Sequence, residues 1–315
     1  MAWLCAVMVL VITSLSAFIR LSKAGLGCEP WPQCYGQVLR AQQEGAQLPE
    51  ADTATAAARL AHRVIASSAL LLVLVMVMTA LASRPALWSQ GRMALGLLAL
   101  ALFLAVLGRW TANARIPAVT LGNLLGGFAM FALSVSMALA AGREVAGQVA
   151  DGAVRASMVR WAWLGAAALV LNVVLGGLVS AGHAGLSCPQ LGGCDTSAAS
   201  WQALDPWQEP RPDAAQPTHP AGAGVHALHR AGGLLVAALL LPLVVAAWRG
   251  GRRAAALVVL GLLILQAGLG AGLVLGGLPL AVALAHNMVA ALLLAVVLGL
   301  ATVGSRQEAR LSPAL

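Results

Sequence analysis

Two histidines lie within long apolar stretches of the sequence and could share one ligand. His229 lies near the start of one stretch, and His286 lies about seven residues into another. At a rise of about 1.5 Å per residue, both side chains can reach a similar depth on facing helices. Two imidazoles placed in this way can bind the iron of a planar haem from both sides. We therefore predict a haem between His229 and His286; the alternative is that both histidines form interhelical hydrogen bonds.

An arginine directly follows the first of these histidines. Arg230 would stand at the membrane edge, where its guanidinium suits a haem propionate. The same pair of residues recurs in the first half of the chain as His62 and Arg63. His226 lies one helical turn before His229, and we expect it to face the neighbouring loop.

No second histidine stands opposite His62. When TLGNLLGG is aligned with LAHNMVAA, Gly122 takes the position of His286, and a shift of one residue places Asn123 there. Neither residue is a strong axial ligand. The first half therefore offers at most one histidine ligand, which fits either a reactive substrate site or a site that has decayed.

Four of the five cysteines form two C-x5-C motifs, in AGLGCEPWPQC and AGLSCPQLGGC. Both motifs lie in polar loops, which we expect on the oxidising side of a bacterial membrane, so disulfides Cys28–Cys34 and Cys188–Cys194 are predicted. Redox-active thiols are an alternative. A zinc site is a weaker one, because the spacing and the location both argue against it. Cys5 lies in an apolar stretch and is expected to be an inert packing residue.

The composition predicts a multi-span membrane protein. The 315 residues are 60% hydrophobic and only 10% charged, and the mean hydropathy is +0.86. The net charge of +8 comes mostly from arginine, and no soluble basic domain is present to bind nucleic acid. The lipid bilayer, with its anionic headgroups, or an anionic ligand is the expected partner of these arginines.

The continuous apolar blocks predict an all-α protein of about eight transmembrane helices, since a span needs roughly 20 apolar residues. The N-terminal block has no basic region before it, so it is interpreted as the first span and not as a signal peptide. The expected spans lie near 2–21, 62–83, 92–109, 117–141, 160–181, 226–248, 254–275 and 279–302.

The chain also repeats itself. The C-x5-C motifs follow the first and fifth spans, and the histidine-arginine pairs open the second and sixth. Four spans return the chain to its starting side, so both halves share one orientation. This pattern predicts two tandem, similarly oriented four-helix bundles, formed by residues 1–142 and 143–315.

The arginine-rich short connections all fall on one side of this arrangement, which we expect to be cytoplasmic. Both termini then lie in the cytoplasm, and both long loops lie outside a multi-pass plasma (inner) membrane. Arg109 and Arg115 fall on the outer side, and a local anion beside them is expected. The arginines on the cytoplasmic side are Arg84, Arg92, Arg143, Arg155, Arg160, Arg249, Arg252, Arg253, Arg306 and Arg310.

The loop GCEPWPQCYG, the two histidine-arginine pairs and the histidine of the last span, in this order, resemble the haem A synthase family. The resemblance covers nearly the whole chain. It implies eight spans in two similar bundles. It also implies the conversion of haem O to haem A for cytochrome oxidase, in which successive hydroxylations oxidise a ring methyl group to a formyl group.

Site residues follow from the same resemblance. His229 and His286 would be the axial ligands of haem B in the C-terminal half, and His62 would be the catalytic residue at the substrate-haem site in the N-terminal half. Arg63 and Arg230 would face haem propionates, and the cysteine pairs would flank both sites. The implied partners are haem O, the membrane enzyme that produces it, and an electron donor that the sequence does not identify.

Two residues depart from the family's pattern, both in the N-terminal half. The family usually has Glu-x-x-His-Arg, and Arg59 stands where the glutamate is expected. The family also usually has a histidine in the fourth span, where this chain offers Gly122 or Asn123. A carboxylate could instead come from the preceding loop, from Glu50 or Asp52.

Two other functions compete with the enzyme. The departures favour a non-catalytic haem-binding membrane protein, for electron transfer or haem handling in oxidase assembly. A transporter is disfavoured, because no Asp or Glu lies well inside any predicted span.

Overall fold

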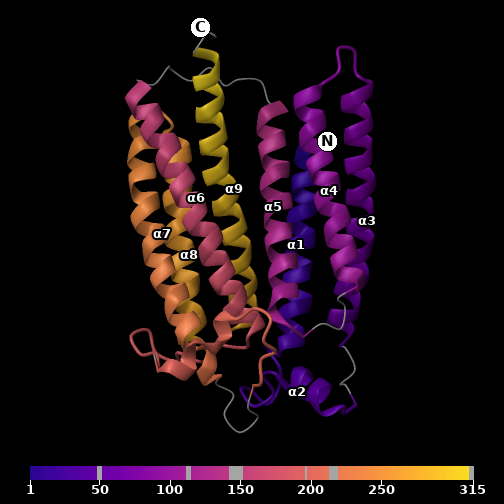
Figure 1. Cartoon of the computed structure of the whole chain (residues 1–315), viewed down its shortest axis with the longest axis vertical. Helices are drawn as coiled ribbons and strands as arrows, with labels where there is room; N and C mark the ends of the chain where they lie inside the picture. Colours follow the sequence, from indigo (N-terminus) through magenta and orange to yellow (C-terminus); the bar gives the residue numbers. More distant parts are fainter. Residues whose placement is uncertain (48–51, 111–114, 142–151, 196, 213–218, 312–315) are drawn as a thin grey trace.

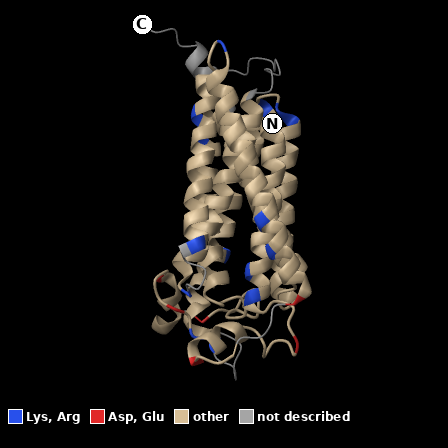
Figure 2. Cartoon of the chain, turned by 90° about the vertical axis from the view of Figure 1, so that its right-hand side faces the viewer, with Lys and Arg blue, Asp and Glu red and all other residues tan. Residues whose placement is uncertain are grey.

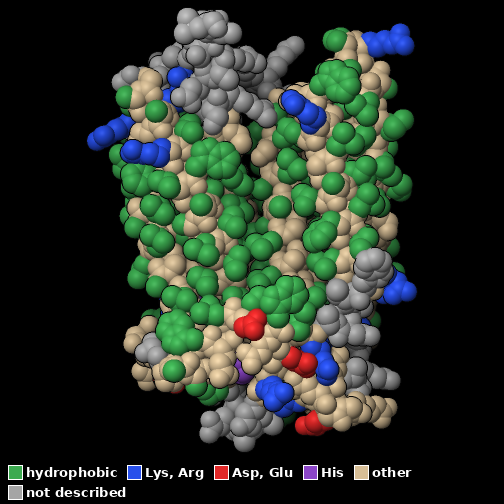
Figure 3. Space-filling model, viewed as in Figure 1, with side chains coloured by type: hydrophobic (Ala, Val, Ile, Leu, Met, Phe, Trp, Pro, Cys, Tyr) green, Lys and Arg blue, Asp and Glu red, His purple; other side chains and the backbone are tan. Residues whose placement is uncertain are grey.

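Eight long helices make up most of the computed structural model, which describes residues 1–47, 52–110, 115–141, 152–195, 197–212 and 219–311. Each is long and apolar enough to cross a membrane, which confirms the predicted all-α, multi-span architecture. On the face shown in Figure 3, hydrophobic side chains cover the middle of the molecule and charged ones gather at its two ends. The helices are α1 (Ala2–Ala24), α3 (Thr53–Ala82), α4 (Trp88–Trp110), α5 (Pro117–Ala141), α6 (Gly152–Ala181), α7 (Ala223–Arg249), α8 (Arg253–Leu275) and α9 (Leu280–Leu311).

The helices lie in two groups side by side, with α1, α3, α4 and α5 on one side and α6 to α9 on the other (Figure 1). Helices α5, α6, α9 and α1 meet at the seam between the groups. A polar contact crosses it, in which the Arg20 guanidinium of α1 donates to the Ser180 hydroxyl of α6 at 2.8 Å. The predicted domain boundary and Arg143 both fall in residues 142–151, outside the described residues.

Several helices begin before the apolar block that predicts them. Helix α3 begins at Thr53, because the carboxylate of Asp52 accepts a hydrogen bond from the backbone N–H of Thr55 at 2.6 Å and caps the helix. His62 therefore lies more than two turns inside α3, and not at its first turn as predicted. Hydropathy marks only the part that suits the hydrocarbon core, whereas the hydrogen-bonded backbone continues into the polar interface.

The two long polar segments lie together at one end of the molecule, opposite the start of α1 and the end of α9 (Figure 1). We call this the cysteine end. The acidic residues coloured in Figure 2 gather at it, whereas Lys and Arg occur at both ends. The first segment contains α2 (Gln37–Glu44), which the hydropathy pattern did not predict, and the second contains the 3₁₀ helices η1 (Ala198–Leu204) and η2 (Pro220–Gly222).

The two cysteine motifs form elbows, residues 24–36 and 184–194, that interlock through one aromatic side chain. Tyr35 of the first elbow is only 2% exposed, and its ring centroid lies 5.4 Å from that of His183 beside the second elbow. Its hydroxyl lies beside Gly185 of the second elbow, 3.4 Å from where a Cβ of that residue would stand. The elbows, which lie far apart in sequence, therefore pack as one unit.

An ion pair links the second segment to the start of α5. Arg115, which precedes α5, lies 2.9 Å from the carboxylate of Glu209 in the second segment. Gln43 of α2 donates to the same carboxylate at 2.9 Å. Glu209 is thus the local anion that we expected beside Arg115.

Acidification is expected to weaken this packing through His183. Burial lowers the pKa of His183 to about 4, from an ordinary value of 6.5. Below pH 6.5 the unfolded chain binds a proton that the folded chain does not, so stability falls until the pH reaches about 4, by about 3 kcal/mol. The measurement is the apparent melting temperature in detergent at pH 7 and pH 4.5.

The matched variant is His183→Asn, since asparagine tolerates the positive φ of 53° at this position. It should lose less stability between the two pH values than the parent chain. An unchanged pH dependence in His183→Asn would contradict the assignment.

Candidate functional site

Each of the four helices α6 to α9 places one polar side chain in the same region of an otherwise apolar bundle. The rings of His229 on α7 and His286 on α9 lie 6.3 Å apart between centroids, with their planes at 74°. Gln266 of α8 approaches His286, and Asn172 of α6 lies beside His229. We call these four residues the histidine-amide cluster. The structure thus brings together the two histidines that the sequence placed at similar depth.

The His229 ring is oriented by a backbone carbonyl. Its Nδ1 lies 3.0 Å from the carbonyl oxygen of Asn172. A carbonyl can only accept, so Nδ1 carries the hydrogen and donates, and Nε2 keeps its lone pair. Gly176 lies four residues after Asn172, and a Cβ there would stand only 2.8 Å from Cε1 of the ring. A glycine at 176 is therefore what allows His229 to reach this carbonyl.

The His286 ring contacts the amide of Gln266, whose nitrogen lies 3.1 Å from the ring's Nε2. Three buried polar atoms in the cluster have no hydrogen-bond partner in the part of the chain that is described: Nδ1 of His286, Oε1 of Gln266 and Oδ1 of Asn172. Each such atom costs about 1–3 kcal/mol, and buried polar groups in native proteins are nearly always paired. Their concentration around the two histidines marks this region as a candidate site for a further group.

The separation of the two ring centroids is close to the value expected for two imidazoles bound to one metal ion. A metal–imidazole bond is about 2 Å long and the ring centroid lies about 1 Å behind the nitrogen, so two axial imidazoles have centroids about 6 Å apart. No group of three or more His, Cys, Asp or Glu residues that could hold a metal occurs in the described ranges. A metal bound by this pair would need further ligands from elsewhere, as iron has in haem.

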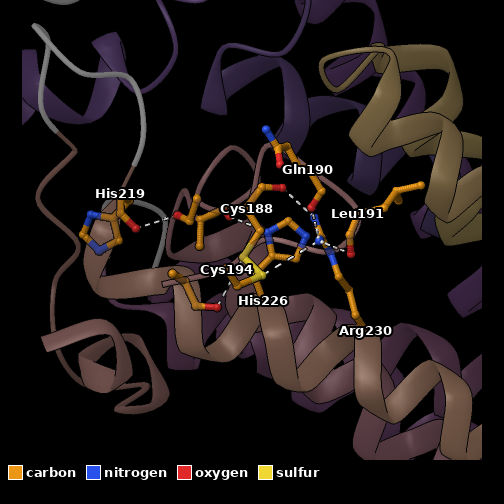
Figure 4. The surroundings of a disulfide bond; sticks show 10 residues. Cys188, Gln190, Leu191, Cys194, His219, His226 and Arg230 are labelled. Carbon is orange, nitrogen blue, oxygen red and sulfur yellow. Dashed lines mark hydrogen bonds between the residues drawn. A yellow bond between two sulfur atoms is a disulfide. The ribbon is translucent and has the colours of Figure 1, made fainter. Parts of the chain in front are cut away.

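Arg230, the residue after His229, holds the second elbow (Figure 4). Its Nη1 donates to the carbonyl oxygens of Gln190 and Leu191 at 2.6 and 3.2 Å, and its Nη2 donates to that of Cys188 at 2.6 Å. Nη1 also lies 3.8 Å from the sulfur of Cys194. The guanidinium that we expected to face a propionate thus clamps the loop beside the disulfide, and only its buried Nε lacks a partner among the described residues.

Both predicted disulfides are present. Cys28 bonds to Cys34 and Cys188 bonds to Cys194, with Cα atoms 6.0 and 4.8 Å apart. The alternatives of free thiols and of a zinc site at these cysteines do not apply to this structure. Cys5 is free and buried, as predicted for a packing residue.

His226 is buried and its Nδ1 lies 3.0 Å from the carbonyl oxygen of Ala184 at the start of the second elbow. It faces the loop, as expected from its position one turn before His229. A cavity of about 310 Å³ lies elsewhere at the cysteine end, lined by Asp205 and His219 among others. It does not reach the histidine-amide cluster.

The equivalent region of the first half is built differently. The Asn123 amide donates to the Val119 carbonyl of its own helix at 3.1 Å. A Cβ on Gly122 would lie 2.9 Å from the Leu107 side chain of α4, which fills the space beside it. Leucine packing therefore occupies the place where the second half holds a histidine.

The charged residues near His62 do not replace the missing groups. Arg59 and Arg63 are both exposed on α3. The Asp52 carboxylate is used as the cap of α3, and Glu50 lies outside the described residues. His62 has no hydrogen-bond partner within the described ranges.

Sequence reasoning missed the two amides of the cluster. Asn172 is the only Asn or Gln in α6, and Gln266 is the only one in α8. A single amide in the middle of an apolar span was the available signal, because such a group requires an internal partner.

Comparison with known proteins gives a consistent result. Residues 1–298 match the COX15-CtaA family, which is described as cytochrome oxidase assembly protein. The chain is also similar to the haem A synthase of Shewanella oneidensis, with 32% identity over 304 aligned residues that cover 91% of each chain. Both matches span the two groups of helices.

Replacing Arg230 with glutamine is expected to loosen the second elbow, because three hydrogen bonds from a charged donor are lost. Reduction of Cys188–Cys194 by a mild thiol should then be several-fold faster, measured by trapping free thiols and mass spectrometry. Arg40→Gln is the matched control, since Arg40 donates to the Tyr35 and Gln33 carbonyls beside the other disulfide. Equal rates at Cys188–Cys194 in the parent chain and the Arg230 variant would contradict the clamp.

Proposed function

Because the chain belongs to the COX15-CtaA family of cytochrome oxidase assembly proteins, we propose that it is a haem A synthase-like membrane oxidoreductase. Its substrate is haem O, and its product is haem A, formed when successive hydroxylations convert a ring methyl group to a formyl group. The observation that carries the proposal is the pair His229 and His286, with ring centroids 6.3 Å apart and with Asn172 and Gln266 beside them.

In this proposal haem B lies between His229 and His286. When bound, it supplies a one-electron redox centre whose potential depends on its two imidazoles and on its buried site. The chain's contribution is to hold two neutral imidazoles at a fixed separation in apolar surroundings. The Asn172 carbonyl keeps His229 in the tautomer that offers Nε2.

The main role of Arg230 in this proposal is to hold the second elbow, because most of its N–H groups donate to carbonyls there. Its Nε, buried and without a partner among the described residues, is the donor left for a propionate. The clamp also holds the disulfide loop beside His229, where it would limit the access of water to the site.

The N-terminal half is proposed to bind the substrate haem. His62 of α3 is the proposed catalytic histidine, and exposed Arg63 beside it suits a propionate at the membrane surface. The apolar walls of α3, α4 and α5 would accept the long isoprenoid tail of haem O. A membrane enzyme that makes haem O and a separate electron donor complete the proposed set of partners.

The protein is a multi-pass membrane protein, and its orientation is part of the proposal. We place both termini in the cytoplasm and both elbows outside the plasma membrane. Arginines at the end opposite the elbows support this orientation, as does the presence of two disulfides at the cysteine end. The two tandem halves, residues 1–142 and 143–315, are proposed as copies of one four-helix unit.

A non-catalytic haem-binding protein is the second candidate. The observation that favours it is the leucine packing beside Gly122, together with the internal hydrogen bond of Asn123. In this alternative the C-terminal site would carry electrons or hold haem during oxidase assembly, and the first half would have only a structural role.

Haem analysis separates the two candidates. Membranes containing the chain and a source of haem O should accumulate haem A or hydroxylated haem O, measured by chromatography of extracted haems. His62→Ala should abolish the product while the purified protein keeps its low-spin b-type absorption. A folded, haem-loaded protein that forms no product would exclude the enzyme and favour the second candidate.

The ligand assignment has its own test. His286→Ala should remove the low-spin b-type spectrum, because one axial nitrogen is lost. His226→Asn is the matched control, since an asparagine amide can still donate to the Ala184 carbonyl, and it should keep the spectrum. A low-spin signal that persists in His286→Ala would show that this histidine is not a ligand.

A further inference from the structure

The backbone next to His229 has a feature that recurs next to His286. Asn172 and Gly176 are four residues apart on α6, and Gln266 and Gly270 are four residues apart on α8. In an α-helix the carbonyl of a residue points at the N–H four residues later. A glycine at that later position leaves the carbonyl uncovered, so a side chain of another helix can approach it.

We call such an uncovered carbonyl and its glycine a notch. On α6 the carbonyl of the notch accepts a hydrogen bond from a histidine. The Asn172 carbonyl accepts the Nδ1–H of His229 at 3.0 Å, and a Cβ at Gly176 would collide with the ring. On α8 the same edge of the other imidazole faces the glycine. A Cβ at Gly270 would lie 3.3 Å from Cε1 and 3.8 Å from Nδ1 of His286, so the backbone of this turn of α8 lies beside the ring.

The hydrogen positions on His286 agree with this arrangement. The amide nitrogen of Gln266 lies 3.1 Å from Nε2, and an amide nitrogen can only donate. Nε2 therefore holds the lone pair, and the hydrogen is on Nδ1. That Nδ1 is buried and has no hydrogen-bond partner in the described part of the chain. It is a donor beside an uncovered carbonyl.

We propose that Gln266 and Gly270 form a positioning notch for His286, equivalent to the notch that Asn172 and Gly176 form for His229. The Gln266 carbonyl takes the Nδ1–H of His286, and Nε2 is presented to the haem iron. This inference rests on the proposed function, in which His286 is an axial ligand. The Gln266 side chain has the opposite effect, since its amide competes with the metal for Nε2.

A positioning role of this kind tunes the ligand as well as holding it. A hydrogen bond from Nδ1–H to a carbonyl makes the imidazole more basic, which stabilises the oxidised iron. Losing such a bond therefore shifts the midpoint potential upward and weakens metal binding. A residue that only packed against the ring would not produce a directed change in potential.

Gly270→Ala is the test, because a methyl group there covers the Gln266 carbonyl. We expect haem affinity to fall about 10–100-fold and the midpoint potential of the bound haem to rise. Gly268→Ala is the matched control, since it lies on the same helix and a Cβ there would meet nothing within 4 Å. It should leave both quantities unchanged. The measurements are haem titration followed by absorption, and redox titration of the loaded protein.

The variant Gln266→Leu distinguishes the effect of the Gln266 backbone carbonyl on haem binding from that of its side-chain amide. It keeps the carbonyl and removes the competing amide, so haem binding should become tighter and the potential should not rise. The notch is overturned if Gly270→Ala matches the parent chain in affinity and potential, or if Gln266→Leu weakens binding as Gly270→Ala does. In either case a low-spin signal that still depends on His286 would leave the proposed function standing. A signal independent of His286 would overturn both.

Discussion

Polar groups inside a bilayer have no water to bind, so each must find a partner within the protein. The histidine-amide cluster is the place where this constraint is strongest. Four helices bring one polar side chain each into an apolar bundle, and three of the buried polar atoms remain without partners among the described residues. Burying polar atoms without partners costs free energy that apolar side chains would not. A group bound between His229 and His286 would explain why the chain keeps polar side chains here.

Glycine is what lets these helices approach the histidines. At Gly176 the absence of a side chain opens the backbone to His229, and at Gly232 it leaves room for the Asn172 amide. Side chains of even one carbon at these positions would displace the polar groups. In the first half, glycines of α5 instead make room for apolar side chains, since leucines of α4 pack over Gly122 and Gly126.

The cysteine end joins the two groups of helices. Each elbow is closed by a disulfide and clamped by an arginine, Arg40 in one case and Arg230 in the other. Tyr35 then packs against the neighbouring elbow through His183. Because Arg230 follows His229 directly, the position of the second elbow and that of a proposed haem ligand are mechanically linked. The two halves differ here as well, since Arg63 of the first half is exposed.

The sequence by itself determined the eight spans, both disulfide pairs and the meeting of His229 with His286. These follow from local patterns: continuous hydropathy, a short cysteine spacing and the depth of a residue along a helix. Only the tertiary structure decided which groups each polar side chain meets. Arg230 binds loop carbonyls, Asn123 binds its own helix and Gln266 reaches His286, because hydrogen bonds depend on the rotation and approach of helices that are far apart in sequence. Hydropathy is nearly the same on every face of such helices, so it carries little information about that rotation.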